Sequence, residues 1–159
     1  MNRIPKSFSG SLPQTVTLPA RGQTATGPHK RIRIVVAEDS PVTLRSLCLF
    51  LERHSQLEIV GTATNGAEAV RCVSRLHPDL MVTDLEMPAL NGLDAARVVR
   101  QRYPQTRIVI ISARPSLSRQ ELSQECGADE FIPKDRLNLE LIPWIERLYA
   151  LNLSKETTE

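Results

Sequence analysis

The chain has 159 residues, of which 41% are hydrophobic and 24% charged, and its net charge is +2. This length fits one domain with a single core, and the small positive excess argues against nucleic acid, which needs a concentrated basic face. Three scattered cysteines without a C-x-x-C pair indicate a reduced, cytoplasmic protein. Since no apolar run approaches eighteen residues, we expect no membrane span.

The two ends of the chain read as tails. Residues 1–30 are rich in Pro, Gly, Ser and Thr and show no sustained hydrophobic periodicity, which predicts a disordered segment rather than an organelle transit peptide. Residues 152–159 read as a flexible end. We therefore expect one folded domain over residues 31–151.

Apolar runs alternate with amphipathic segments across this domain. In chain order, the pattern predicts a strand at 31–37, a helix at 40–54, a strand at 57–63, a helix at 65–76, a strand at 80–84, a helix at 91–102, a strand at 107–112, a helix at 118–127, a strand at 130–134 and a helix at 138–151. Capping residues mark three of the helix starts: Ser40 with Pro41, Asn65 with Glu68, and Ser118 with Glu121. This alternation predicts an α/β fold, a doubly wound parallel sheet of five strands with helices on both faces.

Polar residues follow the strands at their carboxyl ends, where such sheets place their ligands. Glu38 and Asp39 follow the first strand, Asp84 ends the third, Ser112 ends the fourth, and Lys134 ends the fifth. Three carboxylates brought together repel one another and need a cation, and Mg²⁺ suits such an oxygen-rich site. With a lysine and a hydroxyl beside them, this set is typical of phosphoryl transfer, and one carboxylate can act as a nucleophile. Asp84 is the best candidate because it closes the middle strand.

The segments VVAEDS, TDLEMPALNGLD, IISA and GADEFIPK resemble the receiver domains of response regulators in two-component signalling. The resemblance covers residues 31 to about 150 and implies a flavodoxin-like sheet with strand order 2-1-3-4-5. LEIVGTATNGAEAV and LDAARVVRQRYPQTRIVIIS are similar to receivers that precede helix-turn-helix output domains. Because the chain ends soon after the last helix, we expect a stand-alone response regulator.

The resemblance also implies roles for single residues. Asp84 would be phosphorylated, while Glu38, Asp39, Asp84 and the backbone carbonyl of Glu86 would hold Mg²⁺. Lys134 would pair with the phosphoryl group. Ser112 would hydrogen-bond to that group and move on phosphorylation, and Phe131 would be the aromatic residue that follows this movement. As a simpler reading, Phe131 is a plain core residue.

The resemblance further implies partners: a sensor histidine kinase or phosphotransfer protein, a downstream protein, and a second copy bound through the fourth helix, fifth strand and fifth helix. Two other functions stay open, a pseudo-receiver that binds partners without phosphorylation and a phosphatase or phosphotransferase that works through an aspartyl phosphate. We expect a signalling protein rather than an enzyme.

Three features depart from or extend the family pattern. The first acid is Glu38, where Asp is commoner, and Pro133 precedes Lys134, whereas the family places its proline after the lysine. A cis bond between Lys134 and Asp135 would cost about 2.5–4 kcal/mol, so we expect trans. Glu86 and Arg114 would form an opposite-charge pair across the mouth of the site that slows hydrolysis of the phosphoryl group.

Overall fold

The structure is a computed structural model that describes residues 30–113 and 118–150. Apart from residue 30, the described part of the chain excludes the expected tails at 1–30 and 152–159, and it also excludes Arg114. The predictions about these segments are therefore untested. The elements are, in order, β1 (Ile32–Ala37), α1 (Pro41–Glu52), β2 (Leu57–Ala63), α2 (Gly66–Leu76), β3 (Leu80–Asp84), α3 (Gly92–Arg102), β4 (Arg107–Ser112), α4 (Arg119–Cys126), β5 (Glu130–Pro133), the 3₁₀ turn η1 (Lys134–Arg136) and α5 (Leu137–Tyr149).

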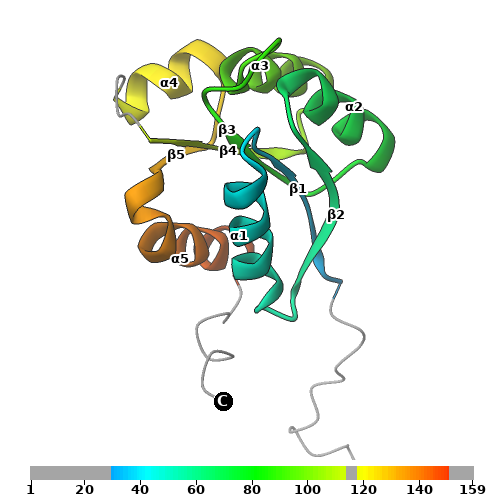
Figure 1. The fold of residues 1–159 in the computed structure, drawn as a ribbon, viewed down its shortest axis with the longest axis vertical. Coiled ribbons are helices and arrows are strands. Elements are labelled where there is room, and N and C mark those ends of the chain that lie inside the picture. Colours follow the sequence, from blue (N-terminus) through cyan, green and yellow to red (C-terminus); the bar gives the residue numbers. More distant parts are fainter. Residues whose placement is uncertain (1–29, 114–117, 151–159) are drawn as a thin grey trace, which may run out of the picture.

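The five strands form one parallel sheet in the order β2-β1-β3-β4-β5, as expected. Helices cover both faces of it (Figure 1). On one face, α1 and α5 pack Leu47, Leu51 and Leu141 against the sheet. On the other, α2 and α3 pack small residues such as Ala69 and Ala96. Because both faces are covered, the strands are continuous apolar runs without the alternation of a half-exposed sheet.

The edge strand β5 accommodates Pro133 because the backbone nitrogen of this residue points away from the neighbouring strand β4. Ile111 of β4 turns its carbonyl toward β3, where it accepts from the Leu85 N–H. Ile111 lies opposite Ile132, so in a parallel ladder it is Ile132 that bonds to β4. The backbone nitrogens of Phe131 and Pro133 then point away from β4, and Phe131 donates its N–H to the Glu130 carboxylate at 2.7 Å. The missing donor of Pro133 therefore costs no ladder bond.

The capping residues lie where the sequence predicts them. Ser40, Asn65 and Ser118 accept hydrogen bonds from the first turns of α1, α2 and α4, and Ser118 and Glu121 form a complete capping box. At α2, the Glu68 carboxylate accepts from the backbone N–H and the hydroxyl of Thr64, the residue before the cap. In each case the side chain satisfies donors that have no partner within the helix.

The segment after β5 differs from the expected continuous strand. Lys134 begins the 3₁₀ turn η1, and α5 then starts at Leu137, one residue earlier than expected. The residues that the structure describes contain no cis peptide bond, which confirms a trans bond between Lys134 and Asp135. Within the same residues, no helix has the length and apolar character needed to cross a membrane.

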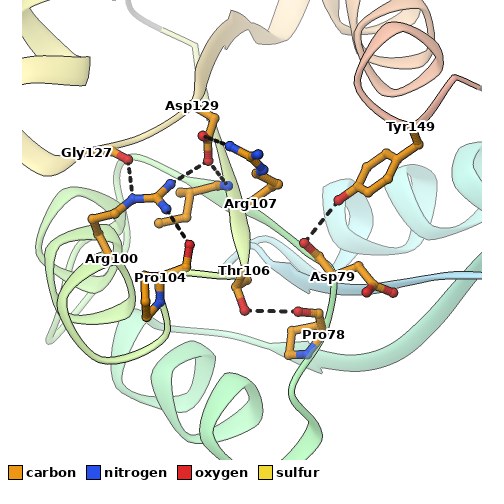
Figure 2. Close-up of polar contacts among 10 residues, drawn as sticks. Pro78, Asp79, Arg100, Pro104, Thr106, Arg107, Gly127, Asp129 and Tyr149 are labelled. Carbon is orange, nitrogen blue, oxygen red and sulfur yellow. Dashed lines mark hydrogen bonds and ion pairs between the residues drawn. The ribbon is translucent and has the colours of Figure 1, made fainter.

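Arginines and acids join several elements at the amino ends of the strands, the end opposite Asp84. Figure 2 shows Asp129 at the centre of this cluster, where it accepts from Arg100 and Arg107. Asp129 also accepts from the backbone N–H of Ile108. Tyr149, at the end of α5, donates to the carbonyl of Asp79 at 3.1 Å. We call Asp79, Arg100, Arg107, Asp129 and Tyr149 the basal network.

Candidate functional site

The parallel sheet brings the predicted polar residues to one edge. Glu38 and Asp39 directly follow β1, and Asp84 is the last residue of β3, the neighbouring strand. One carboxylate oxygen from each of these three residues lies within 4.8 Å of the others. The structure therefore joins the acids that the sequence places 45 residues apart.

Lys134 reaches this acidic cluster from the end of β5, the edge strand two places from β3. Its Nζ lies 2.7 Å from Oε2 of Glu38 and 3.2 Å from Oδ2 of Asp84. The 3₁₀ turn that begins at Lys134 thus delivers the ammonium group without the proline that the family places after it. Glu38 is the nearer partner, because its extra methylene lets the carboxylate extend to the lysine.

Burial sets the electrostatics of the cluster. Glu38 is 1% exposed and Asp84 4% exposed, whereas Asp39 is exposed. Burial raises the pKa of both Glu38 and Asp84, although the Lys134 ammonium opposes the rise in each. For Lys134, burial lowers the pKa, but the two carboxylates outweigh burial and the net shift is upward. The lysine therefore stays charged while the acids are costly to ionise.

Backbone groups fix the two buried acids. Ser40 donates its N–H to Oε1 of Glu38 at 3.1 Å, and the backbone N–H of Glu86 donates to Asp84. The loop after β3 is closed by Gly92, whose N–H donates to the carbonyl of Leu85 at 2.9 Å. These bonds hold the carboxylates at the strand ends.

The residues predicted to switch lie in β4 and β5. Ser112 is fully buried at the end of β4, where it pairs in register with Pro133. Phe131 is 5% exposed and belongs to the apolar cluster between the sheet and α2–α4. This packing fits a core residue, and a switching role for Phe131 stays a prediction. Glu86 has an exposed side chain, while its expected partner Arg114 lies outside the described residues.

The donor set suits a hard cation. Three carboxylates and one ammonium leave the cluster with a negative excess, and all the available donors of Glu38, Asp39 and Asp84 are oxygens. Mg²⁺ prefers such oxygen ligands and retains several waters, so exposure of Asp39 on one side of the cluster is compatible with it. These residues therefore fit the ion that the sequence analysis predicts.

Sequence reasoning missed two contributors next to the site. Glu38 pairs directly with Lys134, and in the sequence only the length of the Glu38 side chain could have suggested this contact. A cavity of about 130 Å³ also opens beside Lys134, between α1 and the start of α5. It is lined by Thr43, Ser46, Leu47, Phe50, Ile111, Leu137 and Asn138. No local pattern marks this cavity, because its walls come from three distant parts of the chain.

The family model for the response regulator receiver domain matches residues 34–145. The chain belongs to this family. Receivers are domains of two-component signalling systems, and the strand order and the acidic edge described above are those of the family's fold.

Two curated relatives carry the same name, protein-glutamate methylesterase/protein-glutamine glutaminase. The one from Geobacter sulfurreducens is 36% identical over 105 residues, which is 66% of this chain and 28% of the relative. The one from Pyrococcus abyssi is 36% identical over 107 residues, 66% of this chain and 29% of the relative. The receiver thus spans under a third of these proteins, and their enzymatic names describe the longer chains.

Solved receiver domains show the same fold. The receiver of NarL from Mycobacterium tuberculosis is 26% identical with a TM-score of 0.70, covering 77% of this chain and 99% of that one. The receiver of CheB from Thermotoga maritima is 26% identical with a TM-score of 0.68, covering 77% of this chain and 98% of that one. The chain therefore shares its fold with the receiver domains of two different response regulators.

Proposed function

We propose that this receiver accepts a phosphoryl group on Asp84 and signals by phosphorylation-dependent contact with another protein. The observation that carries the proposal is the position of Asp84, whose Oδ2 lies 3.2 Å from the Lys134 ammonium beside two further acids. A carboxylate paired with a single cation and placed at a strand end can act as a nucleophile toward phosphorus. The donor would be the phosphohistidine of a sensor histidine kinase or of a phosphotransfer protein.

In the proposed step, a carboxylate oxygen of Asp84 forms a bond to phosphorus while the phosphorus–nitrogen bond of the phosphohistidine breaks. The electron pair of that bond leaves with the imidazole, and Asp84 becomes an acyl phosphate. Lys134 is already 3.2 Å from the attacking carboxylate, so it can pair with the phosphoryl oxygens with little movement.

Mg²⁺ would be held by Glu38, Asp39 and Asp84, with the backbone carbonyl of Glu86, and would supply positive charge next to the phosphoryl oxygens. Glu38 also keeps Lys134 in place through its 2.7 Å ion pair. The protein's own contribution is therefore to orient the nucleophile and the ammonium before the donor arrives.

Ser112 and Phe131 are the proposed route from the site to the surface. Ser112 ends β4, the strand beside Asp84, and can donate its hydroxyl to a phosphoryl oxygen if it moves toward the site. Phe131 lies opposite Ile110 in the neighbouring strand β5. A change at Ser112 would then reach the surface formed by α4, β5 and α5, where a downstream protein or a second copy would bind.

The test is incubation with Mg²⁺ and acetyl phosphate, followed by intact mass and by the rate of acetyl phosphate consumption. One labile phosphoryl adduct, absent from Asp84→Asn and present in the control Asp94→Asn, whose side chain is 42% exposed, would support the proposal. Continuous turnover of unrelated phosphate esters would instead indicate a phosphatase or phosphotransferase. Absence of any adduct would leave the pseudo-receiver as the better account.

The remaining expectations stay predictions about the whole protein. They are a stand-alone regulator, a cytoplasmic location, a disordered segment over residues 1–30 and a flexible end over 152–159. The mass of the protein in cell extracts and limited proteolysis of the purified chain would test the first and the last two.

A further inference from the structure

A polar pocket of about 420 Å³ opens at the amino ends of the strands, the end of the sheet opposite Asp84. We call it the basal pocket. Its walls come from the residue before β1, the turn between α2 and β3, and the turn between α3 and β4. This volume lies in the range of small-molecule sites, which is roughly 300–1,000 Å³. The lining includes the side chains of Lys30, His77, Asp79, Arg102, Tyr103 and Gln105.

Hydrogen bonds within and between the two turns fix the shape of the basal pocket. The Thr106 hydroxyl donates to the carbonyl of Pro78 at 2.9 Å, which joins the two turns (Figure 2). Arg100 of the basal network donates through Nη1 to the carbonyl of Pro104 at 3.0 Å, and the Thr106 N–H donates to the carbonyl of Tyr103 at 3.0 Å. The walls are therefore formed before a ligand arrives, which lowers the ordering cost of binding.

The lining carries more positive than negative charge, and its cations have few partners. Arg102 is exposed at the end of α3 and forms no hydrogen bond or ion pair with the other described residues. Lys30 is 83% exposed, and its Nζ lies 4.0 Å from Oδ1 of Asp79. The other oxygen of Asp79 already accepts the Arg33 N–H at 2.9 Å. Two cations thus line the pocket against one engaged acid, which favours an anionic ligand.

His77 and Tyr103 add an aromatic wall to these charges. Their ring centroids are 6.1 Å apart and their planes meet at 66°. His77 ends α2 with a φ of 46°, in the left-handed region that favours glycine, and Arg33 holds this turn by donating through Nη1 to the His77 carbonyl at 3.1 Å. The chain therefore keeps an imidazole where glycine would be more stable, which is typical of residues with a function.

We propose that the basal pocket binds a nucleotide, with the phosphate at Lys30 and Arg102 and the base at Tyr103 and His77. Ammonium and guanidinium groups bind phosphate through charge-assisted hydrogen bonds, and aromatic side chains stack on bases. The exposed amide of Gln105 can donate to and accept from the edge of the base. Because this site lies at the opposite end of the sheet from Asp84, the nucleotide is a second input that does not depend on phosphorylation.

The experiment titrates the isotope-labelled full chain, without Mg²⁺, and follows the backbone amide shifts by NMR. The probes are the four ribonucleoside monophosphates, their free nucleosides and inorganic phosphate. Arg102→Met removes a guanidinium group and keeps its apolar stem, while His77→Gly removes the ring and relieves the left-handed conformation. Urea unfolding of each variant measures its stability.

Two control variants match these changes outside the pocket. Arg45→Met replaces an exposed arginine of α1, and Ala150→Gly relieves a left-handed residue at the end of α5, where φ is 53°. Both should bind nucleotide as the wild type does, since neither residue lines the basal pocket.

In the wild type, at least one monophosphate should shift the amides of residues 77–79 and 102–106. It should bind at least about tenfold more tightly than its nucleoside or inorganic phosphate, because only the nucleotide contacts both the cations and the rings. Arg102→Met should weaken binding by about tenfold, the effect of losing a charge-assisted hydrogen bond. His77→Gly should weaken it by about fivefold or more without lowering the urea midpoint, a combination that a merely structural histidine would not give.

Four results would overturn this inference, and none of them bears on phosphorylation of Asp84. The first is that no monophosphate moves the amides of the basal pocket, and the second is that a monophosphate moves only those around Glu38 and Asp84. The third is that inorganic phosphate binds as tightly as every monophosphate, which would indicate an adventitious ion only. The fourth is that Arg45→Met loses as much affinity as Arg102→Met, as unspecific attraction to a basic surface would produce.

Discussion

Replacement of Gly92 by alanine should destabilise the receiver and impair its site together. Gly92 opens α3 and lies against the end of β3, where an added Cβ would overlap the carbonyl oxygen of Asp84 and lie 2.8 Å from its carbonyl carbon. Both neighbours are backbone atoms of a buried strand, so neither can rotate away. The substitution therefore pushes directly on the residue proposed to be phosphorylated.

The magnitude follows from the size of the overlap. Carbon atoms rest at roughly 3.5–4.0 Å, so the contact with the carbonyl carbon alone requires the backbone near Gly92 to move by about 0.7 Å, and the closer carbonyl oxygen requires a larger movement. Overpacking of this kind costs about 1–3 kcal/mol and occasionally more, while the helix propensity gained by alanine is at most about 1 kcal/mol. Because both overlapping atoms belong to the backbone, we take the upper end of this cost and expect a net loss of about 2 kcal/mol in the free energy of unfolding, which would lower the urea midpoint by roughly 1–2 M. Displacement of Asp84 should also slow phosphorylation by acetyl phosphate by about tenfold or more.

Gly61 provides the matched control. A Cβ there would lie 2.7 Å from Cδ1 of Leu76, the far end of a flexible side chain, so Gly61→Ala should cost clearly less and leave phosphorylation unchanged. Urea unfolding by circular dichroism and intact mass after a fixed incubation measure both effects. If Gly92→Ala unfolds at the wild-type midpoint or above it, the argument from backbone overlap is wrong.

Three further predictions concern titration and capping. Burial, with help from the charge of Asp79, raises the pKa of Tyr149 to about 12, so the folded state should lose stability as the pH rises from about 10 to 12. Tyr149→Phe should cost about 1 kcal/mol at neutral pH and should remove that alkaline loss, as measured by urea unfolding at a series of alkaline pH values. Burial raises the pKa of Asp84 above its value in the unfolded chain, so ionisation of Asp84 destabilises the fold as the pH rises. Without Mg²⁺ at pH 7, Asp84→Asn should therefore unfold at a higher urea concentration than the wild type, and the difference between the two midpoints should be smaller near pH 4. Ser118→Ala should cost α4 about 1 kcal/mol, seen as faster exchange of its amides, and equal exchange in the variant and the wild type would refute the capping argument.

The fold and the acidic edge were predictable because they depend on local signals and one topological rule. Ser40, Ser118 and Gly127 mark helix ends by their own backbone and side-chain chemistry, and the structure confirms all three. The apolar runs fix the strands, and parallel pairing sends their carboxyl ends to one edge. Asp84 and Lys134 therefore meet at 3.2 Å although fifty residues separate them in the sequence.

The basal network was missed for the opposite reason. Arg100 and Arg107 both bind Asp129, although a run of arginines in a sequence usually indicates only a solvated face. A charge run gives no sign of partners 22 and 29 residues away. Arg107 and Asp129 lie at the amino ends of the adjacent strands β4 and β5, and this position could have predicted their ion pair. The prediction would have required the strand order first.

The charges of the site connect its stability to its proposed signal. Glu38, Asp39 and Asp84 face a single ammonium group, and burial of two of them makes this excess of negative charge costly in the folded state. A divalent cation would remove the excess, and a phosphoryl group on Asp84 would restore part of it at the same edge. The added charge would favour any donor that can approach, and the Ser112 hydroxyl, at the end of the adjacent strand, is such a donor. The charge that phosphorylation adds at Asp84 would therefore act on Ser112 and, through it, on the surface formed by α4, β5 and α5.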